Sequence, residues 1–263
     1  MSSATINRTR CKRDGICIKV CPMGILESDP DKFPRVADDK STLCIKCGHC
    51  VAVCGQSAIA VEGIAPADCE DLHPELAVTP AQVSQYFKSR RSVRLYQNKE
   101  VPRTVLEQIL HVARWAPTAK NCQVVEYLAI DSPPQLRHLL ELTIDFLRPN
   151  PGLARLVAAH DAGRDLILRS APLLLIAHAP TASYNPTVDC TIALAHVDLL
   201  ANTFGLGGCW AGLLMAAVNG HAPLRAALDL PAGHGAYGAL MLGYPKLQFA
   251  RIPPRRELRV SWR

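Results

Sequence analysis

The pattern of hydrophobic positions changes at about residue 80. Beyond that point, apolar residues either recur at helical spacing or gather in short runs bounded by turn residues. The pattern predicts three kinds of segment: amphipathic helices, one long apolar helix, and buried strands. In chain order, the expected helices are 80–89, 102–115, 134–147 and 189–204, and the expected strands are 124–130, 172–179 and 235–243. This mixture, with no strand–glycine-loop–helix signature, predicts an α+β domain over residues 80–263.

The part of the chain before residue 80 follows no sustained period. Thr79 followed by Pro80 is a favourable helix start, because threonine caps a helix N-terminus and proline suits its first turn. The stretch before it is acidic and contains prolines, which is typical of a linker. We therefore expect a small domain over residues 1–62, a linker over 63–79, and the α+β domain over 80–263.

Seven of the eleven cysteines fall before residue 55, in two runs of related spacing. The second run is Cys44-x-x-Cys47-x-x-Cys50-x-x-x-Cys54, which is the spacing of bacterial two-cluster ferredoxins. The first run repeats that spacing as Cys11-x-x-Asp14-x-x-Cys17-x-x-x-Cys21, with an aspartate in place of one cysteine. A zinc site usually pairs two Cys-x-x-Cys units, and this pattern does not suit it.

In such a pattern, the fourth cysteine of each run serves the other cluster. Residues 24–41 would then form a hairpin between the two halves. The site with Asp14 is expected to be labile, because a carboxylate is a harder ligand for iron than a thiolate. It holds either a [4Fe-4S] cluster with Asp14 or water on one iron, or a [3Fe-4S] cluster. The two predicted ligand sets are Cys21, Cys44, Cys47 and Cys50, and Cys11, Asp14, Cys17 and Cys54.

The charge is unevenly distributed along the chain. Up to Pro80, 9 Lys and Arg stand against 11 Asp and Glu, whereas the remainder has 20 against 12. The basic residues are scattered arginines without interleaved aromatic side chains, which favours an anionic small cofactor over nucleic acid. Neither a signal peptide nor a membrane span is visible in the sequence, so we expect a cytoplasmic protein without a membrane partner.

Four segments of the basic part carry a resemblance to a known family. They are Ser89–Arg94, Ala116–Gln123, Gly205–Trp210, and Gly243–Lys246 together with Arg251–Arg255. In this order, they resemble the FMN-dependent nitroreductase family, and more closely its branch with a fused N-terminal dicluster (2[4Fe-4S]) ferredoxin domain. The resemblance implies an α+β fold with a central mixed sheet, and a homodimer with two FMN sites at the subunit interface.

The resemblance also implies which residues meet the flavin. Arginine binds phosphate in a bidentate manner, which suits the first segment to the FMN phosphate and ribityl chain. The segment from Pro117 is expected to meet the flavin of the partner subunit. The same arginines could instead form a solvated helix end, and Gly205–Gly208 could be a helix C-cap followed by a strand. The expected cofactor-binding residues are Arg90, Arg91, Ser92, Arg94, Pro117, Thr118, Ala119, Asn121, Gly207, Gly208, Lys246 and Arg251.

These features predict an FMN-dependent oxidoreductase that passes electrons from iron–sulfur clusters to flavin and on to an organic acceptor. The expected acceptors are nitroaromatics, quinones or activated alkenes, and the expected donor is a low-potential protein such as ferredoxin. No catalytic side chain is expected, because the flavin N5 carries the chemistry. Two alternatives stay open: an NAD(P)H-fed nitroreductase with accessory clusters, and a non-catalytic redox sensor or electron carrier.

Overall fold

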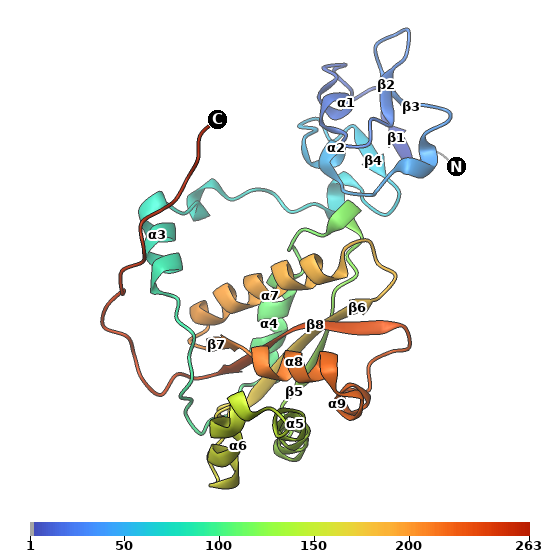
Figure 1. Cartoon of the computed structure of the whole chain (residues 1–263). Coiled ribbons are helices and arrows are strands. Elements are labelled where there is room, and N and C mark those ends of the chain that lie inside the picture. The colour runs from blue at the N-terminus through green and yellow to red at the C-terminus, as the bar shows by residue number, and fades with distance from the viewer. Residues whose placement is uncertain (1–2) are drawn as a thin grey trace. The chain divides into compact units, whose positions relative to one another are not determined.

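The computed structural model describes residues 3–263, and it divides them into two compact units. The first unit holds the chain up to Ala77 together with Lys120–Cys122, and the second holds Val78–Ala119 and Gln123–Arg263. The segment predicted as a linker contains two short 3-10 helices, η2 (Pro66–Asp68) and η3 (Pro74–Leu76). Figure 1 shows the chain from end to end, and each unit is described by itself below.

The first unit is built from short elements around a small apolar core. Two antiparallel strand pairs, β1 with β4 and β2 with β3, flank two helices of about one turn. The β2–β3 pair confirms the hairpin expected over residues 24–41. A core this small contributes little stability, and small domains commonly need metal or disulfide staples. The elements are β1 (Ala4–Ile6), α1 (Ile16–Val20), β2 (Leu26–Ser28), β3 (Pro34–Val36), η1 (Ser41–Leu43), α2 (His49–Ala52) and β4 (Ile59–Val61).

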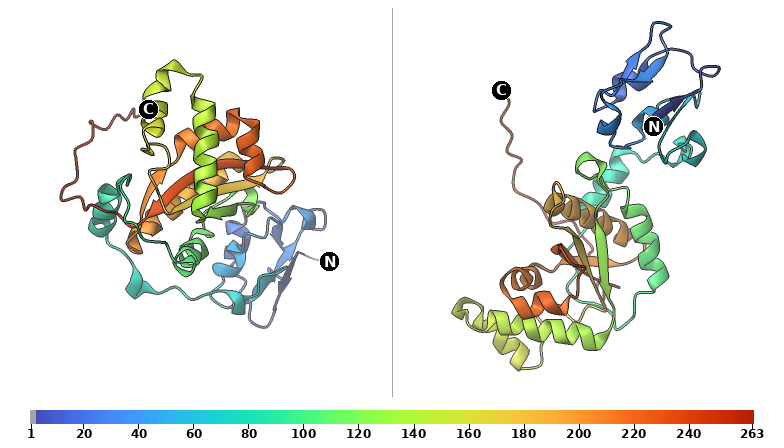
Figure 2. Two further views of the ribbon diagram at one scale, coloured as in Figure 1. Left: turned by 90° about the horizontal axis from the view of Figure 1, so that it is seen from below. Right: turned by 90° about the vertical axis from the view of Figure 1, so that its right-hand side faces the viewer.

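The second unit is organised around a four-stranded sheet with helices on both faces, as Figures 1 and 2 show. The strand order is β5-β6-β8-β7, and every pair in it is antiparallel. The α+β class is thus as predicted, but the expected mixed pairing is not found among the described strands. The consecutive strands β6 and β7 do run in the same direction, but β8 lies between them and is antiparallel to both, so no parallel pair forms. The strands are β5 (Glu126–Ile130), β6 (Leu173–Pro180), β7 (Gly207–Trp210) and β8 (His234–Gly243).

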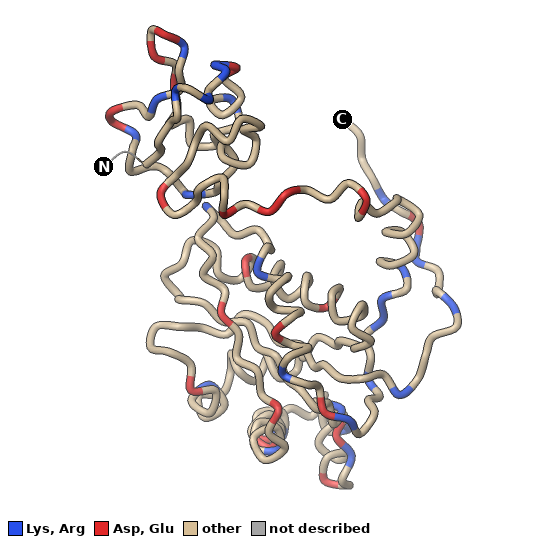
Figure 3. The backbone as a smooth tube through the Cα atoms, turned by 180° about the vertical axis from the view of Figure 1, so that it is seen from behind, with Lys and Arg blue, Asp and Glu red and all other residues tan. Residues whose placement is uncertain are grey.

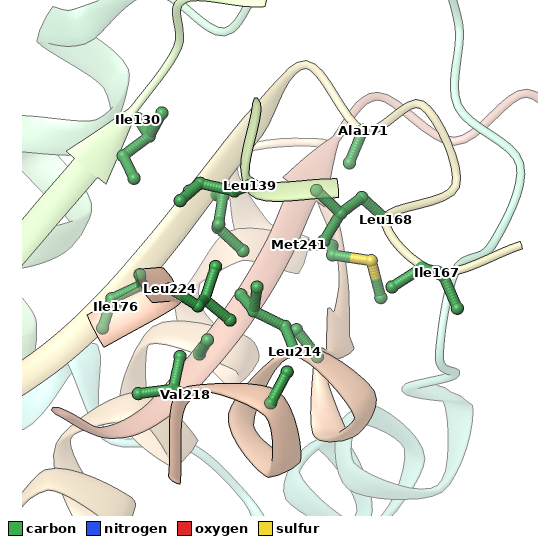
Figure 4. Packing of buried hydrophobic residues seen from close by; sticks show 14 of the residues in the cluster. Ile130, Leu139, Ile167, Leu168, Ala171, Ile176, Leu214, Val218, Leu224 and Met241 are labelled. Carbon is green, nitrogen blue, oxygen red and sulfur yellow. The ribbon is translucent and has the colours of Figure 1, made fainter. Parts of the chain in front are cut away.

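Two apolar cores lie on opposite faces of this sheet. One packs α4 and α7 against residues such as Leu175 and Leu240. The other packs α5, α6, α8 and α9 against the opposite face, where Leu139, Leu214 and Leu224 meet (Figure 4). The helices are α3 (Pro80–Ser89), α4 (Arg103–Ala113), η4 (Ala119–Asn121), α5 (Pro133–Leu147), η5 (Pro151–Leu153), α6 (Ala154–Asp161), α7 (Pro186–Thr203), α8 (Gly212–Gly220) and α9 (Ala222–Ala227).

The helix α3 begins where the capping residues predict. The Thr79 hydroxyl accepts a hydrogen bond from the Gln82 backbone N–H at 3.3 Å. In return, Gln82 Oε1 accepts one from the Thr79 backbone N–H at 2.8 Å. This reciprocal pair satisfies two N–H groups that the helix leaves unpaired. The helix ends at Ser89, and Arg90 follows as its C-cap residue. Within residues 3–263, no helix is both long and apolar enough to cross a membrane.

Candidate functional site

The first unit gathers seven of its cysteines around two separate cavities. One cavity is lined by Cys21, Cys44, Cys47 and Cys50, and the other by Cys11, Asp14, Cys17 and Cys54. Each set takes the first three residues of one run and the last cysteine of the other, and the packing of α1 against α2 brings the two runs together. The structure therefore brings together the same two groups of four that the spacing predicts.

Left-handed glycines turn each cysteine loop into its helix. Gly15 precedes α1 with φ 68°, and Gly48 precedes α2 with φ 72°. A residue with a Cβ rarely adopts this conformation, and glycine does so readily. The turn at Gly48 lets Cys47 and Cys50 face the same cavity.

The thiols of both cavities lie in surroundings that disfavour free thiolates. Burial raises the pKa of Cys50 to about 11, and the neighbouring Cys47 and Cys21 thiols act in the same direction. Burial likewise raises the pKa of Cys17. Such crowded thiols ionise readily only when a metal neutralises them. The donor set and its enclosure therefore fit iron–sulfur clusters.

Backbone N–H groups point at two of the sulfur atoms in the second cavity. The Arg13 N–H donates to Cys11 Sγ at 3.4 Å, and the Ala58 N–H donates to Cys54 Sγ at 3.3 Å. Hydrogen bonds of this kind tune the reduction potential of a cluster. Asp14 lines the same cavity, and its Oδ1 accepts a hydrogen bond from the Ile16 N–H at 3.1 Å.

In the second unit, the segment after α3 runs beside the segment after β8. The Lys246 N–H donates to the Leu95 carbonyl at 2.9 Å, and the Gln97 N–H donates to the Tyr244 carbonyl at 2.8 Å. These contacts bring two segments together that lie about 150 residues apart in the sequence. Lys and Arg recur along both segments, as the tube in Figure 3 shows. An anionic group placed between them would meet cations from both sides.

The predicted arginines differ in their partners. Arg90 Nη1 lies 3.2 Å from Asp198 Oδ2 on α7, so its guanidinium is already engaged. Burial raises the pKa of Asp198, and the charge of Arg90 acts in the opposite direction. The guanidinium of Arg91 lies over the Phe249 ring, with its Cζ 5.8 Å from the ring centroid. Arg94, Lys246 and Arg251 are exposed, and Ser92 is half-buried.

The two glycines of β7 have a packing role. A Cβ at Gly207 would overlap the Val93 side chain, and a Cβ at Gly208 would overlap the Asp198 carboxyl group. The Gly208 carbonyl also accepts a hydrogen bond from the Val93 N–H at 2.9 Å. Gly207 and Gly208 are buried, and they allow the arginine segment to lie directly on the edge of the sheet.

Side-chain oxygens of Asp189 and Thr118 hold the backbone of the segment that begins at Pro117. The Ala119 N–H donates to Asp189 Oδ1 at 2.9 Å, and the Gln123 N–H donates to Thr118 Oγ1 at 2.9 Å. Asn121 falls in the first unit, where its Nδ2 donates to the carbonyls of Ile45 and Lys46.

Asp189 and Asp198 hold the two candidate FMN-binding segments in place, and neither was predicted from the sequence. Both are buried in α7. Their signal was present, since an ionisable residue inside an otherwise apolar helix is almost never buried without a partner.

Two family models match the chain. The model described as the Nitroreductase family matches residues 87–244, and the model described as a 4Fe-4S dicluster domain matches residues 9–59. A protein of Methanothermobacter thermautotrophicus, provisionally named an NADH dehydrogenase/NAD(P)H nitroreductase, is 26% identical over 193 residues. That alignment covers 71% of this chain and 87% of the relative.

Solved structures share the fold of the second unit. A nitroreductase from Bacteroides fragilis with bound FMN matches with a TM-score of 0.56 and 24% identity, covering 68% of this chain and 99% of the other. A nitroreductase from Desulfitobacterium hafniense, also with bound FMN, matches with a TM-score of 0.58 and 18% identity, covering 68% and 98%.

Proposed function

The chain belongs to the nitroreductase family, and from this we propose that it is an FMN-dependent oxidoreductase that passes electrons from iron–sulfur clusters to flavin and on to an organic acceptor. The observation that carries the proposal is the gathering of seven cysteines and Asp14 into two four-residue sets, in a chain whose larger part is a nitroreductase. A reductase fed directly by a nicotinamide has no need of two such sets.

The FMN site of this proposal uses the two basic segments of the second unit. Arg90, Arg91 and Ser92 would hold the phosphate and ribityl chain, and Arg94 would meet the polar edge of the ring. Lys246 and Arg251 would approach the phosphate from the other segment. When bound, FMN supplies the N5 atom that accepts and donates the electrons. The protein positions the ring and neutralises its phosphate, and the fold shared with two FMN-bound nitroreductases supports this assignment.

The first unit would carry two clusters with the predicted ligand sets. Cys21, Cys44, Cys47 and Cys50 offer four thiolates, which suits a stable [4Fe-4S] cluster. The other set offers Asp14 as its fourth member, and its cluster is the labile one. Iron analysis of an Asp14→Cys variant tests this assignment: a more oxygen-resistant cluster is expected, and unchanged loss of iron in air would contradict it.

We further propose a homodimer, with Pro117, Thr118, Ala119 and Asn121 meeting the flavin of the partner subunit. Exposed apolar side chains support a partner surface within the second unit. Phe87 on α3 is 58% exposed, and the C-terminal segment exposes Leu258 and Trp262 by 88% and 91%. Sedimentation equilibrium measures the mass directly, and a monomer at micromolar concentration would contradict the dimer.

The identity of the electron donor distinguishes a ferredoxin-fed enzyme from an NAD(P)H-fed one. The purified protein is mixed anaerobically with reduced ferredoxin, NADH or NADPH, and the flavin and cluster absorbance bands are followed after each addition. Bleaching by ferredoxin, followed by reoxidation with a nitroaromatic, a quinone or an activated alkene, is the expected result. A protein with clusters that binds no added FMN and reduces no acceptor would instead be an electron carrier or sensor.

An NAD(P)H-fed nitroreductase with accessory clusters is the second candidate. It is favoured by the name of the relative from Methanothermobacter thermautotrophicus, an NADH dehydrogenase/NAD(P)H nitroreductase. Rapid reduction of the flavin by NADH or NADPH, with the cluster bands unchanged, would favour this candidate over the ferredoxin-fed enzyme.

Replacing Arg91 with glutamine is expected to weaken FMN binding by roughly tenfold to a hundredfold, because hydrogen bonds to a charged group are each worth about 1.5–3 kcal/mol. The dissociation constant is measured by quenching of FMN fluorescence on titration with flavin-free protein. Arg155→Gln on α6 is the control, since Arg155 is an exposed arginine that lies outside both basic segments. Equal affinities of the two variants would remove Arg91 from the site.

A further inference from the structure

Three metal-ligating side chains converge on one face of the sheet of the second unit. Glu126 on β5 stands directly opposite His178 on β6, and His234 on β8 stands opposite Pro180, two residues further along β6. Residues opposite each other in an antiparallel pair point to the same face, as do residues two apart in one strand. The register therefore places Glu126, His178 and His234 side by side.

The ligand atoms of these three residues lie close enough for one ion. One ligand atom from each residue lies within 4.8 Å of the other two, and the Nδ1 atoms of His178 and His234 are 2.9 Å apart. In a tetrahedral zinc site with Zn–N bonds of about 2.0–2.1 Å, neighbouring ligand atoms are roughly 3.3 Å apart. The two imidazoles are thus near that spacing already, and Glu126 is exposed and can rotate to complete it.

The three residues combine a buried ligand with a position that solvent can reach. His178 is only 5% exposed, so one ligand is fixed by the core. His234 lines a surface cavity together with residues of the loop before β8, such as Asp229 and Gly233. Two imidazoles and a carboxylate are a donor set that binds zinc and related divalent ions, with a fourth position left for water.

We propose that Glu126, His178 and His234 form a binding site for a divalent transition-metal ion of the zinc type. The site joins β5, β6 and β8, and it lies at the opposite end of β8 from Gly243 and the basic segment that follows. It uses none of the cysteines of the first unit and none of the residues assigned to FMN. A bound ion would link these three strands through their side chains.

The test uses the whole protein with its native cofactors, purified anaerobically. Protein passed over a chelating resin is dialysed against micromolar Zn²⁺, and zinc and iron are counted per chain by mass spectrometry. One zinc per chain with unchanged iron is expected, and the zinc should raise the thermal midpoint of the second unit. Zinc that appears only as iron is lost would mean occupation of the cysteine sets, and would overturn the proposal.

Substitutions assign the zinc to these residues. His234→Ala is expected to weaken zinc binding by more than about tenfold, and Glu126→Gln, at an exposed position that tolerates the change, should weaken it as well. His160→Ala is the matched control, since His160 pairs with Glu141 at 3.1 Å elsewhere in the same unit. Retention of zinc by His234→Ala and Glu126→Gln at wild-type affinity would show an adventitious ion only.

Discussion

Replacing Cys47 with serine is expected to remove one iron–sulfur cluster and to stop ferredoxin-driven turnover, while FMN stays bound. Cys47 lines the cavity with three other cysteines, and a serine hydroxyl is a hard, poorly ionised ligand for iron. Iron content should fall by about four atoms per chain, since a cubane cluster holds four. Turnover is followed with reduced ferredoxin as the donor and a nitroaromatic or quinone as the acceptor.

The same variant should keep its flavin chemistry when electrons bypass the clusters. A chemical reductant such as dithionite should still reduce the FMN of Cys47→Ser. Cys69→Ser is the matched control, because Cys69 is exposed and lines neither cysteine cavity. If Cys47→Ser lost its cluster and still turned over with ferredoxin at the wild-type rate, the proposed route through the clusters would be wrong.

The sequence predicted the cysteine sets because ligand spacing is a local property. Each run places three ligands on one loop, and the known geometry of two-cluster sites supplies the exchange of the fourth. The helix α3 was predicted with the bounds that the structure gives it, since Thr79 and Pro80 define a helix start. Both features depend on residues that are close together in the sequence, so both could be predicted from the sequence alone.

Other elements depend on partners that are distant in the sequence. The strand β7 has four residues, two of them glycines, and its stability comes from pairing with β8 and packing on Val93. The helix α8 is apolar almost throughout its sequence, so its pattern does not indicate which face is buried; the fold buries Leu214, Ala217 and Val218. Intrinsic propensity says little about segments of this kind.

The candidate FMN-binding segments of the second unit likewise depend on partners that are distant in the sequence. The arginine segment could be recognised from its composition, but its contact with Asp198 joins residues 108 positions apart. The Asp189 contact with Ala119 spans 70 positions. Only the fold brings these pairs together, and they reveal that Arg90 has a structural partner in addition to its proposed ligand.

That partner leads to the second prediction: Arg90→Met should destabilise the second unit by about 2–3 kcal/mol at neutral pH. Removing one member of a buried ion pair leaves the other charge uncompensated, which typically costs about 3–5 kcal/mol. We expect a destabilisation below this range because solvent reaches the pair from one side: the Arg90 side chain is 26% exposed, although that of Asp198 is only 6% exposed. All three tryptophans of the chain, Trp115, Trp210 and Trp262, lie in the second unit, so urea unfolding followed by tryptophan fluorescence reports on it.

The destabilisation should depend on pH in a defined direction. Burial raises the pKa of Asp198 in the folded protein above its value in the unfolded chain. An ionised Asp198 therefore costs stability at pH values above the unfolded pKa, and this cost disappears as the group takes up a proton. Arg90 offsets the cost when the carboxylate is charged. The difference in unfolding free energy between wild type and Arg90→Met should consequently be largest at neutral pH and shrink as the pH falls.

Two further variants separate charge from packing. Adding Asp198→Asn to Arg90→Met removes the uncompensated charge, so the double variant should recover part of the lost stability and lose the pH dependence. Arg103→Met breaks the exposed pair with Asp131 instead, and no comparable destabilisation is expected because solvent screens that pair. If Arg90→Met lost the same stability at every pH, the contribution of Arg90 would come from the packing of its side chain rather than from its charge.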